Sequence, residues 1–411
     1  MNWKHVSLGE ISVNIQTGPF GSQLHQSDYS EKGTPVVMPK DLISGHISEE
    51  SIARVSDDHV ERLSRHKIEV GDILYSRRGD VGRCAFASET EAGWLCGTGC
   101  LRVTIDSRKA NPKFVFYQLL KADTIGWVEK HAVGSTMLNL NTSILSSVPI
   151  DLPSHDKQNH IVGVLSAYDD LIENNQKQIK LLEEAAQRLY KEWFVDLRFP
   201  GHETTPIVDG VPDGWTYKPF SEVFDYVRGK SYTSKELSDT TGILMANLKN
   251  IRAFGGYNRN AEKRFTGQYK ANQMLYAGDI AMGVTDMTQE RRLVGHVALV
   301  PDLGEKMTFS MDLIKIIPKL TDNLFLYSAM YYGGLSKQIS PLANGVNVLH
   351  LKPEAMMGIE MLIPTKDILE RYHQQFAPMV TRIEALQKQC DVAAEARDRL
   401  IPKLMNREIE V

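Results

Sequence analysis

The sequence predicts a mixed α/β (α+β) protein of two tandem globular domains, each followed by a long helix, the two helices pairing as an antiparallel coiled coil with pseudo-twofold symmetry. Three observations support this fold class: an internal repeat, short strand-like and helical runs within each copy, and a heptad pattern closing each copy. The expected boundaries are a globular domain at 1–153, a helix at 154–198, a linker at 199–213, a second globular domain at 214–364 and a second helix at 365–411.

The repeat is plainest between GSTMLNLNTSILSSVPIDLPSHD from Gly134 and GVNVLHLKPEAMMGIEMLIPTKD from Gly345, which align without a gap 211 residues apart. Each copy also carries a Gly-Asp-Ile strand start, at Gly71 and Gly278. VGRCAF and VGHVAL match only if the second copy holds about six extra residues around 287–292, and such insertions belong in loops. Two similar halves place two similar surfaces about an approximate twofold axis, which suits a twofold partner such as duplex DNA.

Short runs in the first part of each copy predict its secondary structure. Strands are expected at PVVM, DILYS, CLRVTI, ILMAN, VGHVALV and LIKIIP, and short helices at FVFYQLLKA and LFLYSAMYY. Glycine turns separate these runs. Each globular domain should therefore be a compact mixture of short strands and helices.

The two long helices carry the a/d rhythm of a coiled coil, with positions spaced by alternating fours and threes. In the first helix the seam includes Ile161, Leu165, Ile172, Asn175, Ile179, Leu182 and Leu189, and in the second Phe376, Ile383, Leu386, Ala393 and Leu400. We expect Asn175 to be a polar residue that fixes register. The alternative is that each helix packs only on its own domain.

Composition sets modest bounds on function. A chain of 411 residues with 42% hydrophobic and 24% charged residues is ordinary for a soluble protein of two or three domains. Without a long apolar segment or an apolar signal core in MNWKHVSLGE, we expect a cytoplasmic protein with no membrane partner. The four cysteines (Cys84, Cys96, Cys100, Cys390) lack a second ligand pair at zinc spacing, so we expect buried thiols, no metal and no cofactor.

A net charge of −4 argues against a generally basic coat but permits a local basic surface. Residues 245–300 hold eight basic and four acidic side chains interleaved with aromatic ones, a composition that fits either a nucleic-acid surface or a solvated face. Acidic residues gather instead at Glu49, Glu50, Asp57, Asp58 and Glu61 and along Asp169–Glu184. We expect those regions to point away from DNA.

Four motifs carry a family resemblance across essentially the whole chain: GPFGSQL from Gly18, GDILYSRRGDVG from Gly71, GSTMLNLN from Gly134, and VPIDLPSHDKQNHIVGVLSAYDDLIENNQKQI from Val148. With their recurrence as RGKSY, AGDIAM, GVNVLHLK and LIPTKD, they resemble the DNA-specificity subunit of type I restriction-modification systems. The second copy departs most between Gly278 and Val294, where MGVTDMTQERRLVG replaces the glycine turn. Residue-by-residue transfer does not extend through that loop.

The resemblance implies a binding protein without chemistry of its own. Each globular domain would be a target-recognition domain that reads one half of a bipartite sequence in double-stranded DNA. The helices would set the spacing of the halves and dock two adenine-N6 methyltransferase (modification) subunits, and restriction/translocase subunits are possible further partners. The residues agree with this expectation, since the chain has no Asn-Pro-Pro-aromatic run, no Walker A sequence and no HExxH pair.

Candidate DNA-contacting residues follow from chemistry and position, because Arg and Lys bind phosphates and guanine, Asn and Gln bind adenine, and hydroxyls bind either. In the first copy these are Ser22, Gln23, Lys40, Arg77, Arg78, Ser135 and Thr136. In the second copy they are Arg228, Lys230, Lys249, Asn250, Thr285, Gln289, Arg291, Arg292 and Asn347. Two other functions stay open: a non-catalytic coiled-coil scaffold without DNA contact, and a solitary enzyme without recognisable motifs.

Overall fold

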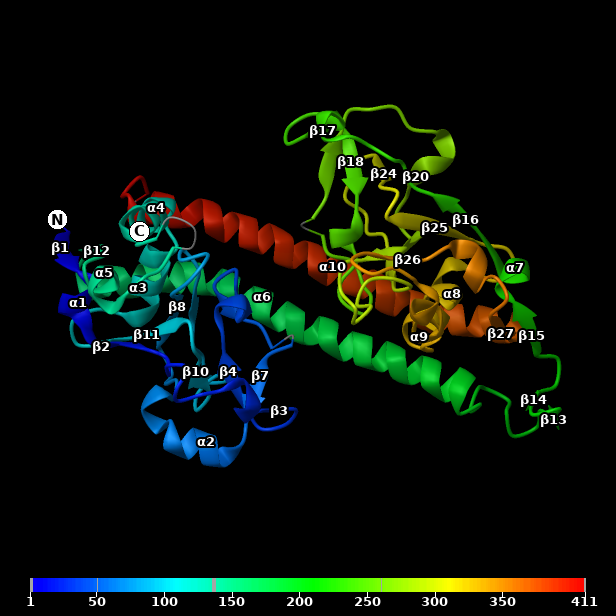
Figure 1. Cartoon of the computed structure of the whole chain (residues 1–411), viewed down its shortest axis with the longest axis horizontal. Coiled ribbons are helices and arrows are strands. Elements are labelled where there is room, and N and C mark those ends of the chain that lie inside the picture. Colours follow the sequence, from blue (N-terminus) through cyan, green and yellow to red (C-terminus); the bar gives the residue numbers. More distant parts are fainter. Residues whose placement is uncertain (1–2, 50, 135–137, 260, 410–411) are drawn as a thin grey trace. The chain divides into compact units, whose positions relative to one another are not determined.

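The computed structural model describes residues 3–49, 51–134, 138–259 and 261–409. Its contacts divide the chain into two compact units, Met1–Asn174 with Gln389–Val411 and Asn175–Lys388. The division passes through both long helices, α6 (His155–Tyr190) and α10 (Lys366–Met405), so each unit contains one globular domain and part of each helix (Figure 1).

The globular part of the first unit mixes short strands with short helices. Its strands are β1 (Lys4–Ser7), β2 (Ser12–Thr17), β3 (Tyr29–Ser30), β4 (Thr34–Val37), β5 (Leu42–Ile43), β6 (His46–Ile47), β7 (Ala53–Val55), β8 (Ile73–Ser76), β9 (Cys84–Phe86), β10 (Leu95–Cys96), β11 (Cys100–Ile105) and β12 (Pro149–Leu152). Its helices are α1 (Leu8–Ile11), α2 (Asp57–Arg62), α3 (Pro112–Leu119), α4 (Ala122–His131) and α5 (Thr142–Ser146), with 3-10 turns η1 (Gln26–Asp28), η2 (Pro39–Asp41) and η3 (Ser64–His66).

The second unit is built in the same way. Its strands are β13 (Ile207–Val208), β14 (Val211–Pro212), β15 (Thr216–Pro219), β16 (Phe224–Arg228), β17 (Leu237–Ser238), β18 (Ile243–Ala246), β19 (Lys263–Phe265), β20 (Met274–Leu275), β21 (Ile280–Gly283), β22 (Thr285–Asp286), β23 (Val297–Leu299), β24 (Met307–Phe309), β25 (Leu313–Pro318), β26 (Leu349–His350) and β27 (Glu360–Ile363). Its helices are α7 (Phe220–Val223), α8 (Asn323–Tyr331) and α9 (Leu335–Ile339), with a π-helical turn η4 (Lys191–Val195) closing α6 and 3-10 turns η5 (Ser234–Glu236), η6 (Leu248–Asn250), η7 (Ala271–Gln273), η8 (Ser340–Leu342) and η9 (Pro353–Met356).

Sheet order confirms that the two globular parts are copies of one fold. The central sheet runs β2-β11-β8-β9 in the first unit and β16-β25-β21-β23 in the second, antiparallel throughout. The second sheet runs β10-β4-β7-β3 and β20-β24-β18-β19-β17, with β10 parallel to β4 as β24 is to β18. The strand entering each copy pairs with the strand that leaves it, β1 with β12 and β15 with β27.

The Gly-Asp-Ile motif forms the same turn in both copies. The Asp72 carboxylate accepts the Glu69 amide at 2.8 Å, and the Asp279 carboxylate accepts the Tyr276 amide at 2.8 Å. Each aspartate also faces a cation on the neighbouring strand, since Arg102 lies 3.5 Å from Asp72 and Lys315 lies 2.6 Å from Asp279. These aspartates therefore hold the start of the central strand.

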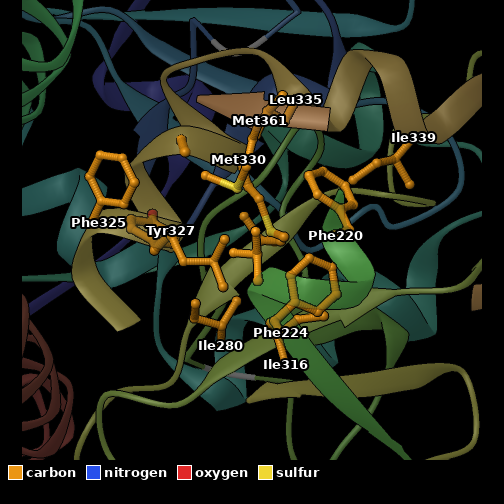
Figure 2. Close-up of a cluster of buried hydrophobic side chains, with 14 of the residues drawn as sticks. Phe220, Phe224, Ile280, Ile316, Phe325, Tyr327, Met330, Leu335, Ile339 and Met361 are labelled. Carbon is orange, nitrogen blue, oxygen red and sulfur yellow. The ribbon is translucent and has the colours of Figure 1, made fainter. Parts of the chain in front are cut away.

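Each unit has its own apolar core. In the second unit, side chains from α7, α8, α9, the central sheet and β27 converge, as Figure 2 shows for Phe220, Phe224, Ile280, Ile316, Phe325, Tyr327, Met330, Leu335, Ile339 and Met361. The core of the first unit draws on the matching elements, with Leu8 and Ile11 on α1 and Phe114 on α3. Burial of each such side chain stabilises the fold by about 1.5–3 kcal/mol.

The two long helices pack antiparallel within each unit. In the first unit Asp169 of α6 meets Arg397 of α10, and Cys390 Sγ lies 3.7 Å from the Ile172 carbonyl oxygen. In the second, Arg382 lies 3.2 Å from Gln178, and the Tyr190 and Tyr372 rings meet edge to face. Since positions further along α6 meet positions earlier in α10, the helices run in opposite directions in both units.

Burial follows the predicted seam closely. Ile161, Leu165, Ile172, Asn175, Phe376, Leu386 and Ala393 are buried, and Ile179, Leu182, Leu189, Ile383 and Leu400 are partly buried. Each helix also ends in a core: Trp193, just beyond α6, lies in the core of the second unit, and Leu404 of α10 lies in the core of the first. The helices thus do more than pack on their own domains.

Candidate nucleic-acid interface

The loops of the first unit converge where β2 and β8 end and β11 begins. The Gly18 amide donates to the Cys100 carbonyl at 2.9 Å, and the Thr98 hydroxyl donates to the Pro19 carbonyl at 2.8 Å. The approach is so close that a Cβ on Gly18 would lie 2.0 Å from the Gly97 oxygen. Only glycine fits there, which explains the GPFG turn.

The turn after β8 joins the same group of loops. The Arg77 amide donates to the Gly99 carbonyl at 2.8 Å, and the Arg77 carbonyl accepts the Leu140 amide at 2.8 Å. The Gly79 amide donates to the Leu138 carbonyl at 3.1 Å. We call residues 18–23, 77–79, 97–99 and 138–140 edge 1. The structure therefore brings the predicted GPFG loop and the paired arginines together, whereas the predicted Ser135 and Thr136 lie outside the described residues.

The polar side chains of edge 1 differ in what they can offer a ligand. Arg78 and Ser22 are exposed, whereas Gln23 uses its Oε1 to accept the Phe20 amide at 3.1 Å. Arg77 is partly buried, and its guanidinium carbon lies 5.8 Å from the centroid of the Phe20 ring. Among the described residues neither arginine has an acidic partner. Edge 1 therefore presents two uncompensated cations, of which Arg77 lies beside an aromatic ring.

The second unit builds the corresponding loops, which we call edge 2 and define as residues 228–232, 284–293, 310–312 and 345–351. The Gly229 amide donates to the Leu313 carbonyl at 3.1 Å, and a Cβ on Gly229 would lie 2.0 Å from the Ser310 oxygen. The Val284 amide donates to Asp312, and the Val284 carbonyl accepts the Leu351 amide, both at 2.8 Å. By these hydrogen bonds Gly229 corresponds to Gly18 and Val284 to Arg77.

The inserted loop of edge 2 is organised by one buried carboxylate. Asp286 is fully buried and accepts the Leu293 amide at 2.6 Å, the Thr288 amide at 2.8 Å and the Val294 amide at 3.3 Å. Burial raises the pKa of Asp286, but these hydrogen bonds outweigh it and hold that pKa below its ordinary value. An ionised carboxylate therefore shapes residues 287–293.

The predicted residues of this loop are held unequally. Gln289 is exposed and donates to the Val346 carbonyl at 2.8 Å, which brings the loop against the turn that carries exposed Asn347. Arg292 forms an ion pair with Glu290, whereas Arg291 has a left-handed φ of 53° and no acidic partner among the described residues. Of the two arginines, Arg291 is thus the uncompensated cation.

Two other predicted residues in the second unit meet internal partners. Thr285 is only 6% exposed and donates to Asp312 at 3.1 Å. Arg228 pairs with Glu354 at 2.9 Å, and the hydrogen bonds on Glu354, led by that from the Tyr226 hydroxyl, lower the pKa of Glu354 to about 2. Thr285 and Arg228 therefore support edge 2, and we leave both out of its contact surface.

Lys40 and Lys249 occupy the same place in the two copies. Each is the exposed middle residue of a 3-10 turn: η2 follows β4, and η6 follows the corresponding strand β18. The last residue of the turn binds back to the backbone: Asp41 accepts the Met38 amide, and Asn250 accepts the Asn247 amide, both at 2.8 Å. Asn250, predicted to contact DNA, is fully buried and also donates to the Asn258 carbonyl, so we leave it out of the contact surface.

The remaining predictions can be placed as well. Lys230 follows Gly229 and bridges to Ser310 through its backbone, without an ion-pair partner among the described residues. Asp169, at the start of the acidic stretch expected to point away from DNA, is buried against Arg397. Cys96 is buried as a free thiol, and burial raises its pKa to about 12. Sequence reasoning missed Phe20, whose only signal was an aromatic residue between two glycines of the GPFG turn.

Two copies of one mixed fold, each ending in a loop edge of different polar residues, define a duplicated recognition protein. Residues 1–184 match the family described as the type I restriction modification DNA specificity domain. The MjaIX specificity subunit of a type I restriction enzyme from Methanocaldococcus jannaschii is 27% identical over 403 residues, covering 92% of this chain and 87% of its own length. The HindI specificity subunit from Haemophilus influenzae is 22% identical over 477 residues, covering 99% and 100%.

A solved structure agrees on the fold. The type I restriction-modification S subunit from M. genitalium superposes with a TM-score of 0.56 at 14% identity, covering 98% of this chain and 96% of that one. Residues 1–184 thus match the type I restriction modification DNA specificity domain, and nearly the whole chain is similar to type I restriction enzyme specificity subunits. Among the described helices, none is both long and apolar enough to cross a membrane.

Proposed function

We propose that this chain is a non-catalytic subunit that binds double-stranded DNA with a bipartite target, edge 1 contacting one half of the target and edge 2 the other. The observation that carries the proposal is that the two copies share one backbone framework but place different residues at corresponding positions of edge 1 and edge 2. Matching hydrogen bonds hold Arg77 in edge 1 and Val284 in edge 2. Divergent side chains on a common framework allow two half-sites of different sequence.

The uncompensated cations of the edges and of the neighbouring turns support a role in binding DNA. They are Arg77, Arg78, Lys230 and Arg291, with Lys40 and Lys249 on the neighbouring turns. Lysine and arginine contacts to phosphates position a protein on the duplex, whereas contacts to base edges select the sequence. We assign these lysines to positioning, and the arginines, glutamine and asparagine of the loops to selection.

We propose that α6 and α10 set the spacing of the half-sites and dock two adenine-N6 methyltransferase subunits, which restriction/translocase subunits can join. Exposed apolar positions recur on the two helices with the period of the repeat. Leu181 on α6 is 64% exposed, and Val392, 211 residues later on α10, is 59% exposed. A repeated exposed apolar side chain fits two copies of the same partner.

Mapping methylated adenines in DNA treated with the complex reconstituted from this chain and its modification subunits tests the proposal. We expect methylation within a bipartite motif, and exchange of residues 287–292 should alter one half of that motif only. Loss of sequence selection in both halves would contradict the proposal that each edge contacts one half of the target. Turnover by the chain alone with DNA and methyl donor would indicate an enzyme, and no gel shift with the modification subunits present would indicate a scaffold.

A further inference from the structure

Phe20 is a large apolar side chain held in an exposed position on edge 1. The side chain is 52% exposed although the backbone around it is firmly fixed. The Phe20 amide donates to Gln23 Oε1, and the Phe20 carbonyl accepts the Gln23 amide at 2.8 Å and the Leu24 amide at 3.2 Å. A fixed backbone carrying an exposed ring indicates a contact residue.

The Phe20 ring restrains Arg77. A guanidinium carbon 5.8 Å from a ring centroid is within cation–π range. The Arg77 Nε is buried and has no hydrogen-bond partner among the described residues, so the two terminal nitrogens are the donors that Arg77 can present. The Phe20 ring therefore restrains one side of the Arg77 guanidinium, and burial of Nε restrains the end that joins the rest of the side chain.

The pair is present in one copy and absent from the other. Gly18 corresponds to Gly229 by its close approach to the facing loop, so Phe20 corresponds to Ser231. Arg77 corresponds to Val284, which is 6% exposed and has no donor. Both members are thus replaced together, as expected of two side chains that act as one unit.

We infer that Phe20 and Arg77 form a guanine-reading unit, in which the terminal nitrogens of Arg77 donate to O6 and N7 of one guanine and Phe20 holds the guanidinium in position. Arginine is the side chain that matches the two acceptors of guanine in the major groove. Phe20 is a positioning residue in this arrangement. The inference rests on the proposed function, because it requires that edge 1 contacts DNA, and it predicts that the other half-site lacks this contact.

The test compares variants in the complete complex with modification subunits. Arg77→Lys keeps the charge but removes the fork, and Phe20→Leu keeps apolar bulk but removes the ring. Arg108→Lys, at an exposed arginine that pairs with Asp106 outside edge 1, is the matched control. Methylation rates are measured on a set of DNAs in which each base pair of both half-sites is changed in turn.

We expect Arg77→Lys to reduce discrimination about 5- to 150-fold at one G·C pair in one half-site. Phe20→Leu should reduce discrimination at the same base pair by a smaller factor. The double variant should lose less discrimination than the product of the two single effects. Discrimination in the other half-site should be unchanged, which also shows that the variants are folded.

A uniform loss across all substrates, or effects of the two variants at different base pairs, would overturn the inference. So would unchanged discrimination in both variants when the unmodified chain still directs methylation to a bipartite target. Absence of a bipartite target for the unmodified chain would contradict the proposed function instead, so the two failures are distinguishable.

Discussion

Arg397 of α10 and Asp169 of α6 form a buried ion pair, with Nη1 2.8 Å from Oδ1. The Tyr117 hydroxyl of α3 donates to the other carboxylate oxygen, and Lys113 lies 3.6 Å from it. One carboxylate therefore joins both long helices to the globular part of the first unit. A buried charge of this kind depends on all of its partners, because each removed partner leaves part of the charge uncompensated.

Arg397→Met should lower the free energy of unfolding of the first unit by about 3–5 kcal/mol, because it leaves Asp169 buried without its cation. Arg399→Met is the matched control, since Arg399 pairs with Glu395 at an exposed site two residues away and should cost at most about 0.5 kcal/mol. Urea unfolding measures the difference. Hydrogen exchange should localise the loss to α3 and the facing parts of α6 and α10, and unchanged exchange there would contradict the role of the pair.

The fold could be predicted because its signals are local and repeated. The strand runs, the Gly-Asp-Ile turn and the heptads each depend on the spacing of apolar and turn residues, which the sequence displays directly. The same reasoning could not predict the buried ion pair between Asp169 and Arg397. Asp169 lies in an acidic stretch whose spacing gives no sign of burial, and its partner Arg397 lies 228 residues away.

The contact residues were less predictable because the sequence does not show what each polar group binds. Asn250 and Lys249 are neighbours in one turn, yet Asn250 is buried and saturated whereas Lys249 is exposed. Phe20 presents the opposite case, because an aromatic residue in a turn gives no sign of whether it faces the core. The glycine at position 18 was a useful sequence signal for the turn, because its close approach to Gly97 is a property of the backbone.

His66 should make the first unit less stable as the pH falls from about 6.5 to about 4. Burial, with the nearby Arg65 and Arg102, lowers the pKa of His66 to about 4, and its Nε2 accepts a hydrogen bond from Arg65 Nε at 2.9 Å. In that window the unfolded chain binds a proton that the folded unit excludes, so the free energy of unfolding falls with falling pH.

His66→Gln should flatten this dependence, measured as the urea midpoint of the first unit against pH. His160→Gln, at an exposed site on α6, is the control for the loss of an imidazole. An identical pH profile for His66→Gln and the unmodified chain would show that another group is responsible.

Lys40→Ala and Lys249→Ala should each weaken DNA binding to a similar degree for all sequences. If each lysine neutralises one phosphate, each substitution reduces the slope of log affinity against log salt by about 0.9. Lys388→Ala, on an exposed position of α10, should leave the slope unchanged. Titrations at several salt concentrations measure the slopes, and a loss confined to one target sequence would assign the lysine to a base instead.

Leu181→Glu and Val392→Glu should each remove one modification subunit from the complex, because a carboxylate in an apolar contact is left without a partner. We expect each variant to weaken one of two binding events at least tenfold, and the double variant to weaken both. Native mass spectrometry counts the bound subunits. Leu171→Arg is the matched control, since Leu171 is 43% exposed but the corresponding residue of the second copy is Arg382. Two bound subunits in the double variant would contradict docking at these positions.

Lengthening both long helices by one heptad should lengthen the tolerated spacer between the half-sites. Seven residues inserted after Asn174 in α6 and after Lys388 in α10 preserve the seam, because the apolar pattern repeats every seven residues. At 1.5 Å per residue the helices grow by about 10 Å, which corresponds to about three base-pair steps of 3.4 Å.

Methylation mapping on DNAs with graded spacers measures the outcome of the heptad insertion. We expect the same two half-site sequences with a spacer longer by about three base pairs. Seven residues inserted into α6 alone would stagger the antiparallel pairing and should abolish methylation at every spacer, because the buried Asn175 and Arg397 would then lose their facing positions. If the matched insertion methylates only the original spacer, the helices do not set the spacing, and the separation of the half-sites must come from the DNA or from the modification subunits.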